Sequence, residues 1–290
     1  MRQTTLAKPI SASGIGLHTG IKANITLKPA PENTGYIFVR KDLDDFEIPA
    51  SIEYISHCSY ATTLLRNGVV ISTCEHLLSA LRGMEVDNCF IEIDEMEVPI
   101  LDGSSKNFVR MIEEAGIRQQ QLPRRILKVT EKIEVVEDSR KISIEPYEGF
   151  KINCIIDFPH PLIRRQEYEF EMKSSNFKKE IAPARTFGFF EEVERLRRAN
   201  LAKGGSLENA IVLTRDQILN SEPLRFENEF VRHKILDIIG DFALLGLPIQ
   251  GKIYAEKSGH ALHASLMIKL IKNSSAWKII ESFRMNSAKI

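Results

Sequence analysis

The sequence has no excess of charge of either sign, because 39 Lys and Arg residues balance 39 Asp and Glu residues in a chain of 290 residues. Domains that bind nucleic acids usually carry a basic excess, and anionic membrane surfaces attract clusters of basic side chains. The balance therefore argues against both partners. With 43% hydrophobic and 27% charged residues, the composition is typical of a soluble globular protein.

Long hydrophobic runs are also missing. A membrane-spanning helix needs about 18 or more consecutive apolar residues, and the best candidate, residues 235–249, is interrupted by Asp237 and Asp241. Residues 1–16 contain no apolar core of the kind that a signal peptide requires. We therefore expect no integral membrane segment and a cytoplasmic location.

Cysteine is scarce, and several nucleotide and nucleophile motifs are absent. The four cysteines form no Cys-x-x-Cys pair and are too few for a disulfide scaffold, so we expect reduced thiols at Cys58, Cys74, Cys89 and Cys154. The sequence has no phosphate-binding loop, no dinucleotide-binding glycine motif after a strand and no nucleophile elbow. The glycine-rich residues 13–20 are better interpreted as a hairpin turn between strands.

The length predicts two domains, since domains typically have about 100–200 residues. Residues 116–125 combine a glycine, a polar run and Pro123, and we interpret them as a linker or domain boundary. This boundary separates a first domain, residues 1–120, from a second domain, residues 126–290.

Each half shows the order helix, strand, helix. The expected elements are residues 72–83, 88–94 and 103–115 in the first half and residues 229–245, 249–256 and 259–271 in the second. We expect two α+β domains of similar topology, each a β-sheet with helices on one face.

Residues 184–210 fit neither pattern. They contain a charged helix over about residues 191–201, and Phe187, Phe189 and Phe190 crowd its start. One interpretation is a surface helix anchored by aromatic residues. The other is an aromatic wall beside an apolar groove.

The helix expected at residues 229–245 carries an ionisable stripe. His233, Asp237 and Asp241 recur at every fourth position on one side of an otherwise largely apolar helix. We expect part of this stripe to be buried, and buried charges need partners or a metal. His233 and Asp237 could reach one cation; a solvated stripe with a local ion pair is the alternative.

A third metal ligand has to come from elsewhere, and His76 lies in the corresponding helix of the first half, directly after Glu75. Adjacent helical residues point about 100° apart, so one of them could bind a metal while the other addresses a water. The alternatives are a buried structural histidine at His76 and a capping box in which Glu75 pairs with Ser72.

His260 and His263 open the last helix of the repeat. A helix N-terminus disfavours protonation of His260, whereas a carboxylate such as Asp241 favours it. His260 is therefore a candidate general acid, and a turn histidine is the alternative.

Seven segments between residue 13 and about residue 263 carry a family resemblance: SGIGLHTG, STCEHLLSALRGMEVDN, LDGSSKNFV, PARTFGF, GGSLENAIV, LRFENEFVRHKILDIIGD and SGHALH. In these segments the chain resembles the zinc-dependent UDP-3-O-acyl-N-acetylglucosamine deacetylases of lipid A biosynthesis in Gram-negative bacteria. The resemblance implies helices sandwiched between two outer sheets, and an inserted element in the second domain that forms an apolar passage for the acyl chain.

The resemblance also implies the metal centre. His76, His233 and Asp237 would bind one catalytic Zn2+, with Fe2+ as an alternative, and Glu75 would be the general base. Two histidines and one aspartate leave a fourth position open for water, as a catalytic zinc requires.

The remaining implied roles surround that centre. His260, oriented by Asp241, would stabilise the oxyanion or protonate the leaving amine. Thr186 would polarise the amide carbonyl, and Lys234 and Phe187 would contact the substrate.

The implied reaction is hydrolysis of the acetamide of UDP-3-O-acyl-N-acetylglucosamine to UDP-3-O-acyl-glucosamine and acetate, the committed step of lipid A biosynthesis. The alternatives are a zinc amidohydrolase for another N-acyl sugar and a non-catalytic acyl-nucleotide-binding protein. We expect a monomer and assign no function to residues 274–290. The preferred acyl-chain length and the identity of the final proton donor stay open.

Overall fold

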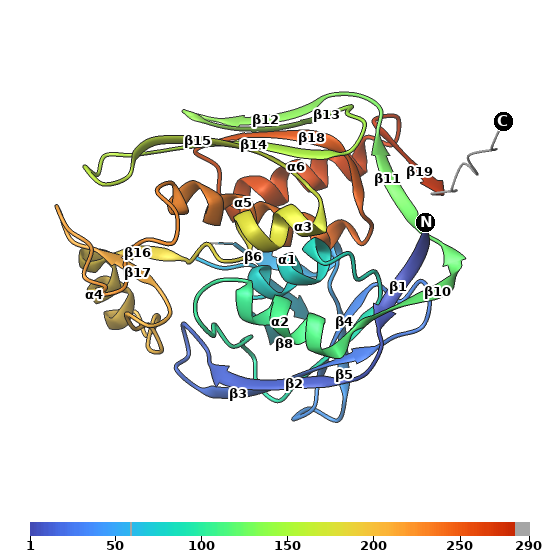
Figure 1. Ribbon diagram of the computed structural model, residues 1–290, viewed down its shortest axis with the longest axis horizontal. Coiled ribbons are helices and arrows are strands. Elements are labelled where there is room, and N and C mark those ends of the chain that lie inside the picture. The colour runs from blue at the N-terminus through green and yellow to red at the C-terminus, as the bar shows by residue number, and fades with distance from the viewer. Residues whose placement is uncertain (59, 282–290) are drawn as a thin grey trace.

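The structure is a computed structural model that describes residues 1–58 and 60–281. Two outer β-sheets enclose a double layer of helices (Figure 1). This arrangement confirms the expected α+β class and the expected position of the helices between the sheets.

The first outer sheet is built from the first half of the chain. Its strands, in spatial order, are β2 (Ile10–Ile15), β3 (Lys22–Pro29), β9 (Cys89–Ile93), β4 (Tyr36–Arg40) and β5 (Phe46–Pro49). Along β3, Ala23, Ile25 and Leu27 are buried while their neighbours are more exposed, because successive side chains of a strand point to opposite faces. Helices α1 (Glu75–Gly83) and α2 (Lys106–Ala115) lie on the inner side (Figure 1).

The second outer sheet is built from the second half. Its strands run in the order β12 (Ile133–Glu137), β13 (Arg140–Glu145), β18 (Ile249–Glu256), β11 (Arg125–Val129) and β19 (Trp277–Glu281), and β14 (Phe150–Phe158) joins β18 to β15 (Arg164–Glu171). Helices α5 (Glu229–Phe242) and α6 (His260–Lys272) lie on its inner side (Figure 1).

The two sheets share a local topology. The strand between the two helices is β9 in the first half and β18 in the second. Strand β9 has β3 as an antiparallel neighbour and β4 as a parallel one, and β18 likewise has β13 and β14. The expected repeat of helix, strand, helix is therefore present.

Shorter elements connect these layers. The small strands are β6 (Ile55–His57), β7 (Thr63–Arg66), β8 (Val69–Ile71), β16 (Phe187–Phe189) and β17 (Ile211–Leu213). The short helices are η1 (Ile52–Tyr54), α3 (Ser174–Asn176), η2 (Phe177–Ile181), α4 (Phe190–Arg198) and η3 (Ala243–Leu245). Of residues 13–20, the expected hairpin turn, residues 13–15 belong to β2, and residues 16–21 form the turn between β2 and β3.

The segment interpreted as a linker is mostly a strand. Residues 117–123 form β10 (Ile117–Pro123), which pairs with β1 (Arg2–Leu6) in antiparallel fashion. Its polar run is compatible with a strand because the buried Gln120 donates to the carbonyl oxygen of Ala30 (2.9 Å) and accepts from Asn88 (2.8 Å). The division into residues 1–120 and 126–290 stays a prediction.

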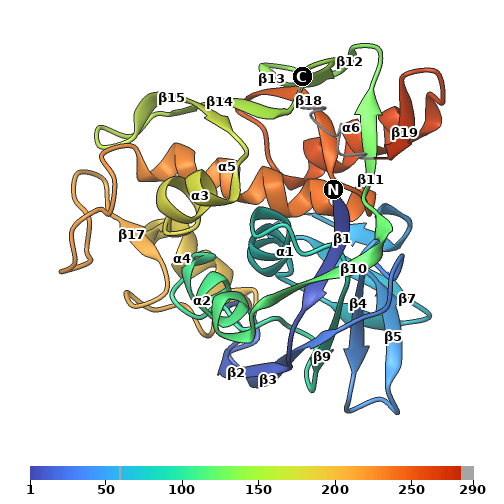
Figure 2. The same ribbon diagram turned by 45° about the vertical axis from the view of Figure 1, so that its right-hand side comes forward.

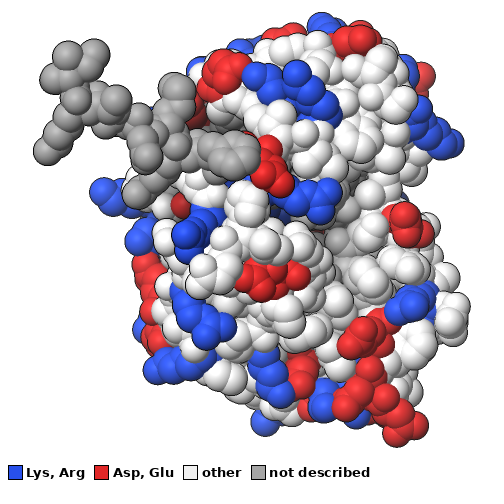
Figure 3. All heavy atoms as spheres, turned by 90° about the vertical axis from the view of Figure 1, so that its right-hand side faces the viewer, with Lys and Arg blue, Asp and Glu red and all other residues white. Residues whose placement is uncertain are grey.

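No helix within residues 1–58 and 60–281 is both long and apolar enough to cross a membrane. On the face shown in Figure 3, basic and acidic side chains are interspersed, so the neutral balance of the sequence holds locally there as well.

Candidate metal centre and active site

The proposed ligands meet where α1 packs directly against α5 in the middle of the molecule (Figure 2). The Oδ1 atom of Asp237 lies 3.3 Å from Nε2 of His233 and 3.6 Å from Nε2 of His76. All three residues are at most 5% exposed, so the stripe on α5 is buried as expected. One ligand atom from each residue lies within 4.8 Å of the others.

The state of these side chains suits a divalent cation. His233 Nδ1 faces the carbonyl oxygen of Ala184 at 3.1 Å, so the Nδ1 proton is donated there and the Nε2 lone pair faces Asp237. Burial lowers the pKa of His233 to about 3, which keeps the imidazole neutral, as metal binding requires. Asp237 Oδ1 is buried without a hydrogen-bond partner among the described residues. A buried, unpaired acceptor beside two histidines could hold a metal.

Glu75 begins α1 and is 3% exposed. Its Oε2 accepts from the backbone N–H of Thr62 (3.2 Å), and its Oε1 lies 3.8 Å from Nε2 of His260. The capping-box interpretation is wrong, because the N-cap residue is Cys74 rather than Ser72, and the side chain of Cys74 makes no capping hydrogen bond. Burial raises the pKa of Glu75, which brings its basicity closer to that needed near neutral pH.

Asp241 lies one turn after Asp237 on α5 and faces three hydrogen-bond donors. Its Oδ2 faces Nδ1 of His260 (2.7 Å) and Nδ1 of His263 (2.6 Å), and its Oδ1 accepts from the hydroxyl of Thr62 (2.5 Å). Burial opposes the charge on His260, but the carboxylates of Asp241, Glu75 and Asp237 together raise the pKa of His260 to about 9. His260 is therefore protonated at neutral pH, and it begins α6 as expected.

The proposed substrate residues border the same site. Lys234 Nζ lies 3.0 Å from Asp237 Oδ2 and 5.7 Å from the ring centroid of Phe187. The Phe187 ring centroid is 6.3 Å from that of His233. Thr186 precedes Phe187, and its backbone N–H donates to the carbonyl oxygen of Gly103 (2.8 Å).

A buried ion pair ties the segment of Thr186 to the start of α5. Arg185 donates from Nε and Nη2 to the two carboxylate oxygens of Glu229, at 2.9 and 3.1 Å. Its backbone N–H also donates to Glu229 (3.0 Å). Such two-pronged geometry fixes orientation as well as distance, so the Ala184 carbonyl is held against His233.

An apolar cavity of about 370 Å³ opens beside Thr186 and Phe187. Its further lining includes Phe189, Val193 and Leu207. Of the two interpretations of residues 184–210, the aromatic wall agrees with this cavity, although α4 itself has no buried residue.

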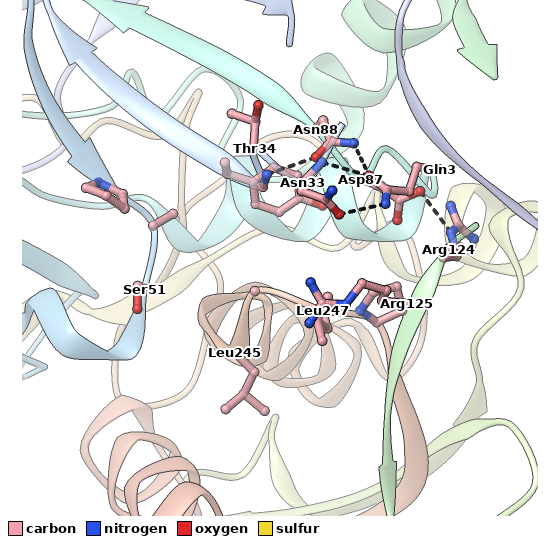
Figure 4. A pocket seen from close by; sticks show the side chains of 16 residues that line it. Gln3, Asn33, Thr34, Ser51, Asp87, Asn88, Arg124, Arg125, Leu245 and Leu247 are labelled. Carbon is pink, nitrogen blue, oxygen red and sulfur yellow. Dashed lines mark hydrogen bonds and ion pairs between the residues drawn. The ribbon is translucent and has the colours of Figure 1, made fainter. Parts of the chain in front are cut away.

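A second cavity, of about 280 Å³, lies where the turn before β18 faces β1 and β4 (Figure 4). None of the predicted site residues lines it. Along one wall Gln3 donates to Oδ1 of Asn33 and accepts from Nδ2 of Asn88, so these amides already have partners.

Sequence reasoning missed three parts of the site. Thr62 stands in a segment with no recognisable motif, His263 was noted without a role, and the carbonyl of Ala184 has no side-chain signature. The only sequence signal was the second histidine of SGHALH, because His260 and His263 lie three residues apart on one side of a helix.

Comparison with known proteins identifies the family to which the chain belongs. The family model of UDP-3-O-acyl N-acetylglycosamine deacetylase matches residues 3–272. The chain belongs to this deacetylase family. It is 45% identical to the UDP-3-O-acyl-N-acetylglucosamine deacetylase of Hahella chejuensis over 97% of this chain and 94% of that protein. The enzymes of the same name from Myxococcus xanthus and Coxiella burnetii are each 46% identical to it over 97% of this chain. These matches span 90% of the Myxococcus protein and 93% of the Coxiella protein.

The match to the deacetylase family covers every residue of the candidate site, from Thr62 to His263. The cluster of His76, His233 and Asp237 is a possible metal site in this member of the family.

Proposed function

We propose that this chain is a zinc-dependent deacetylase that hydrolyses the acetamide of UDP-3-O-acyl-N-acetylglucosamine. The products are UDP-3-O-acyl-glucosamine and acetate, in the committed step of lipid A biosynthesis. The observation that carries the proposal is the buried trio of His76, His233 and Asp237 with Glu75 and the His260–Asp241 pair beside it.

His76, His233 and Asp237 would hold the ion. When bound, Zn2+ supplies a Lewis acid that polarises a carbonyl and lowers the pKa of a water. Fe2+ is the alternative metal, because imidazole and carboxylate ligands also suit iron.

The protein groups then divide the proton transfers. Glu75 takes a proton from the water that adds to the amide carbon. The hydroxyl of Thr186 hydrogen bonds to the carbonyl oxygen as negative charge develops there. His260, held protonated by Asp241, gives its proton to the nitrogen as the carbon–nitrogen bond breaks.

The substrate would be bound by residues around the three metal ligands. Lys234 provides a cation for the UDP-sugar, and Phe187 provides a ring face for the sugar. The apolar cavity beside Phe187 has a size and lining that suit part of an acyl chain. The aromatic start of α4 forms one of its walls.

We further propose that the enzyme is a cytoplasmic monomer. The location is supported by Cys58, Cys74, Cys89 and Cys154, which are all free thiols, as is usual in a reducing compartment.

The decisive experiment is incubation of the purified protein with UDP-3-O-acyl-N-acetylglucosamine and assay of released acetate, with and without a chelator. Chelator-sensitive release is expected. Substrate binding without acetate release would favour a non-catalytic binding protein, and release only from a different N-acyl sugar would favour another amidohydrolase.

A further inference from the structure

Thr62 lies immediately before β7 and is 1% exposed. Its hydroxyl donates to Oδ1 of Asp241 (2.5 Å), and its backbone N–H donates to Oε2 of Glu75 (3.2 Å). The same hydroxyl lies 3.3 Å from Nδ1 of His260. One residue therefore contacts the proposed base and both members of the proposed acid pair.

The hydroxyl decides how the Asp241 carboxylate is oriented. Both histidines, His260 and His263, face Oδ2 of Asp241, while the hydroxyl of Thr62 is the donor that faces Oδ1 among the described residues. Without that donor, Oδ1 is a buried charged oxygen without a partner, which is costly. Rotation of the Asp241 carboxylate toward other donors then becomes favourable, because it gives Oδ1 a new hydrogen bond. The His260 ring is no longer held in one orientation.

The backbone of Thr62 places the base relative to the acid. Thr62 and Glu75 belong to the first half of the chain, whereas Asp241 and His260 belong to the second. Glu75 Oε1 and His260 Nε2 lie 3.8 Å apart. Since Thr62 contacts both sides, it sets the spacing of the two groups that must serve one amide.

We propose that Thr62 is a positioning residue for the hydrolysis, whose hydroxyl directs His260 through Asp241 while its N–H directs Glu75. This inference rests on the proposed function, since it concerns the same site. Thr62 touches no reacting atom in this scheme and acts only through its neighbours. Residues that orient catalytic groups in this way are typically worth about 10–100-fold in activity.

The test compares three variants in the metal-loaded, full-length protein. Thr62→Val removes the hydroxyl and keeps the backbone N–H, whereas Thr62→Ser keeps both. Thr63→Val is the matched control, because Thr63 is also buried (2% exposed) but its hydroxyl faces Ser72 at 3.2 Å. If the valine variant does not fold, comparison of Thr62→Ala with Thr62→Ser also isolates the effect of removing the hydroxyl.

We expect Thr62→Val to lower kcat by about 10–100-fold with little change in KM or metal content, and Thr62→Ser to recover most of it. Thr63→Val should keep the kcat of the unmodified protein. In an Asp241→Ala background, Thr62→Val should cost almost nothing more, because a residue that acts through Asp241 has no effect once Asp241 is absent. An unchanged kcat in Thr62→Val, or a full additional loss in that background, would overturn the proposal.

A second readout does not need activity. The Nδ1 protons of His260 and His263 that face Asp241 should give downfield proton resonances, detectable with ¹⁵N-labelled histidine. Thr62→Val should shift the His260 resonance, and Thr62→Ser and Thr63→Val should leave it in place. An unmoved resonance contradicts the positioning role even if the substrate proves to be different, whereas absence of acetate release by the unmodified protein contradicts only the proposed function.

Discussion

Gly240 of α5 lies directly against the backbone carbonyl of Glu75 in α1, so that a Cβ atom at position 240 would be 2.0 Å from that carbonyl oxygen. No real Cβ approaches an oxygen so closely, and the obstacle is backbone, which cannot swing away. The missing side chain therefore lets α1 and α5 approach until His76 faces Asp237.

Gly240→Ala should separate the two helices and spread the ligands. We expect a loss of stability of about 1–3 kcal/mol from overpacking together with weakened metal binding, measured by urea unfolding and by elemental analysis. Gly188→Ala is the control, because nothing lies within 4 Å of a Cβ built there. Full metal content in Gly240→Ala would show that the close approach is not needed for the centre.

The purified protein should contain about one tightly held transition-metal ion, and chelation should abolish activity and lower Tm, since a bound metal stabilises the folded state. His233→Ala should lose the metal, because it removes one of the three ligands. His160→Ala serves as control, because His160 faces the carbonyl oxygen of Thr214 instead. Full activity of the metal-free protein would refute the mechanism.

Glu75→Ala should keep the metal and lose about 10²–10⁴-fold in kcat, the usual contribution of a general base. Ser72→Ala tests the alternative role. Loss of a capping box would cost both variants about 1 kcal/mol of stability with normal kinetics. Because Cys74 rather than Ser72 is the N-cap residue of α1, we expect Ser72→Ala to retain normal kinetics, whereas Glu75→Ala should lose most of its kcat.

The pH–rate profile should be bell-shaped, with an alkaline limb set by His260. The folded pKa of His260 is raised to about 9, so the proton donor is present at neutral pH and is lost as the pH rises through about 9. The raised pKa of His260 also contributes to the free energy of unfolding. This contribution is fully present below the ordinary pKa of 6.5, and it is lost as the pH rises through about 9.

Asp241→Asn provides the direct test of that limb. With the charge of Asp241 removed, only Glu75 and Asp237 still oppose the effect of burial, so the pKa of His260 falls and the alkaline limb should move to lower pH. An alkaline limb at the same pH in Asp241→Asn would mean that another group titrates there.

Gly188→Leu should narrow the apolar cavity, since Gly188 lines it and the space beyond its Cα is open. We expect kcat/KM to fall for a substrate with a long acyl chain and to change little for one with a short chain. Equal losses for both substrates would argue that the acyl chain lies elsewhere.

The sequence by itself determined the local elements. Strand β18 (Ile249–Glu256) coincides with the predicted range, and α5 with η3 covers residues 229–245 as predicted, because strand and helix periods are properties of neighbouring residues. The same periodicity placed His233, Asp237 and Asp241 on one buried stripe. The choice of His76 as third ligand came from the family resemblance rather than from spacing.

Only the tertiary structure decided which distant groups meet. The strand at Ile117–Pro123 exists because β1, more than a hundred residues earlier, pairs with it. Glu75 turned out to accept from Thr62 rather than to cap its helix, and Thr62 came to lie against Asp241 across 179 positions of sequence. A local pattern fixes which face a side chain occupies, but the packing of two helices, here through the bare backbone of Gly240, decides what that face touches.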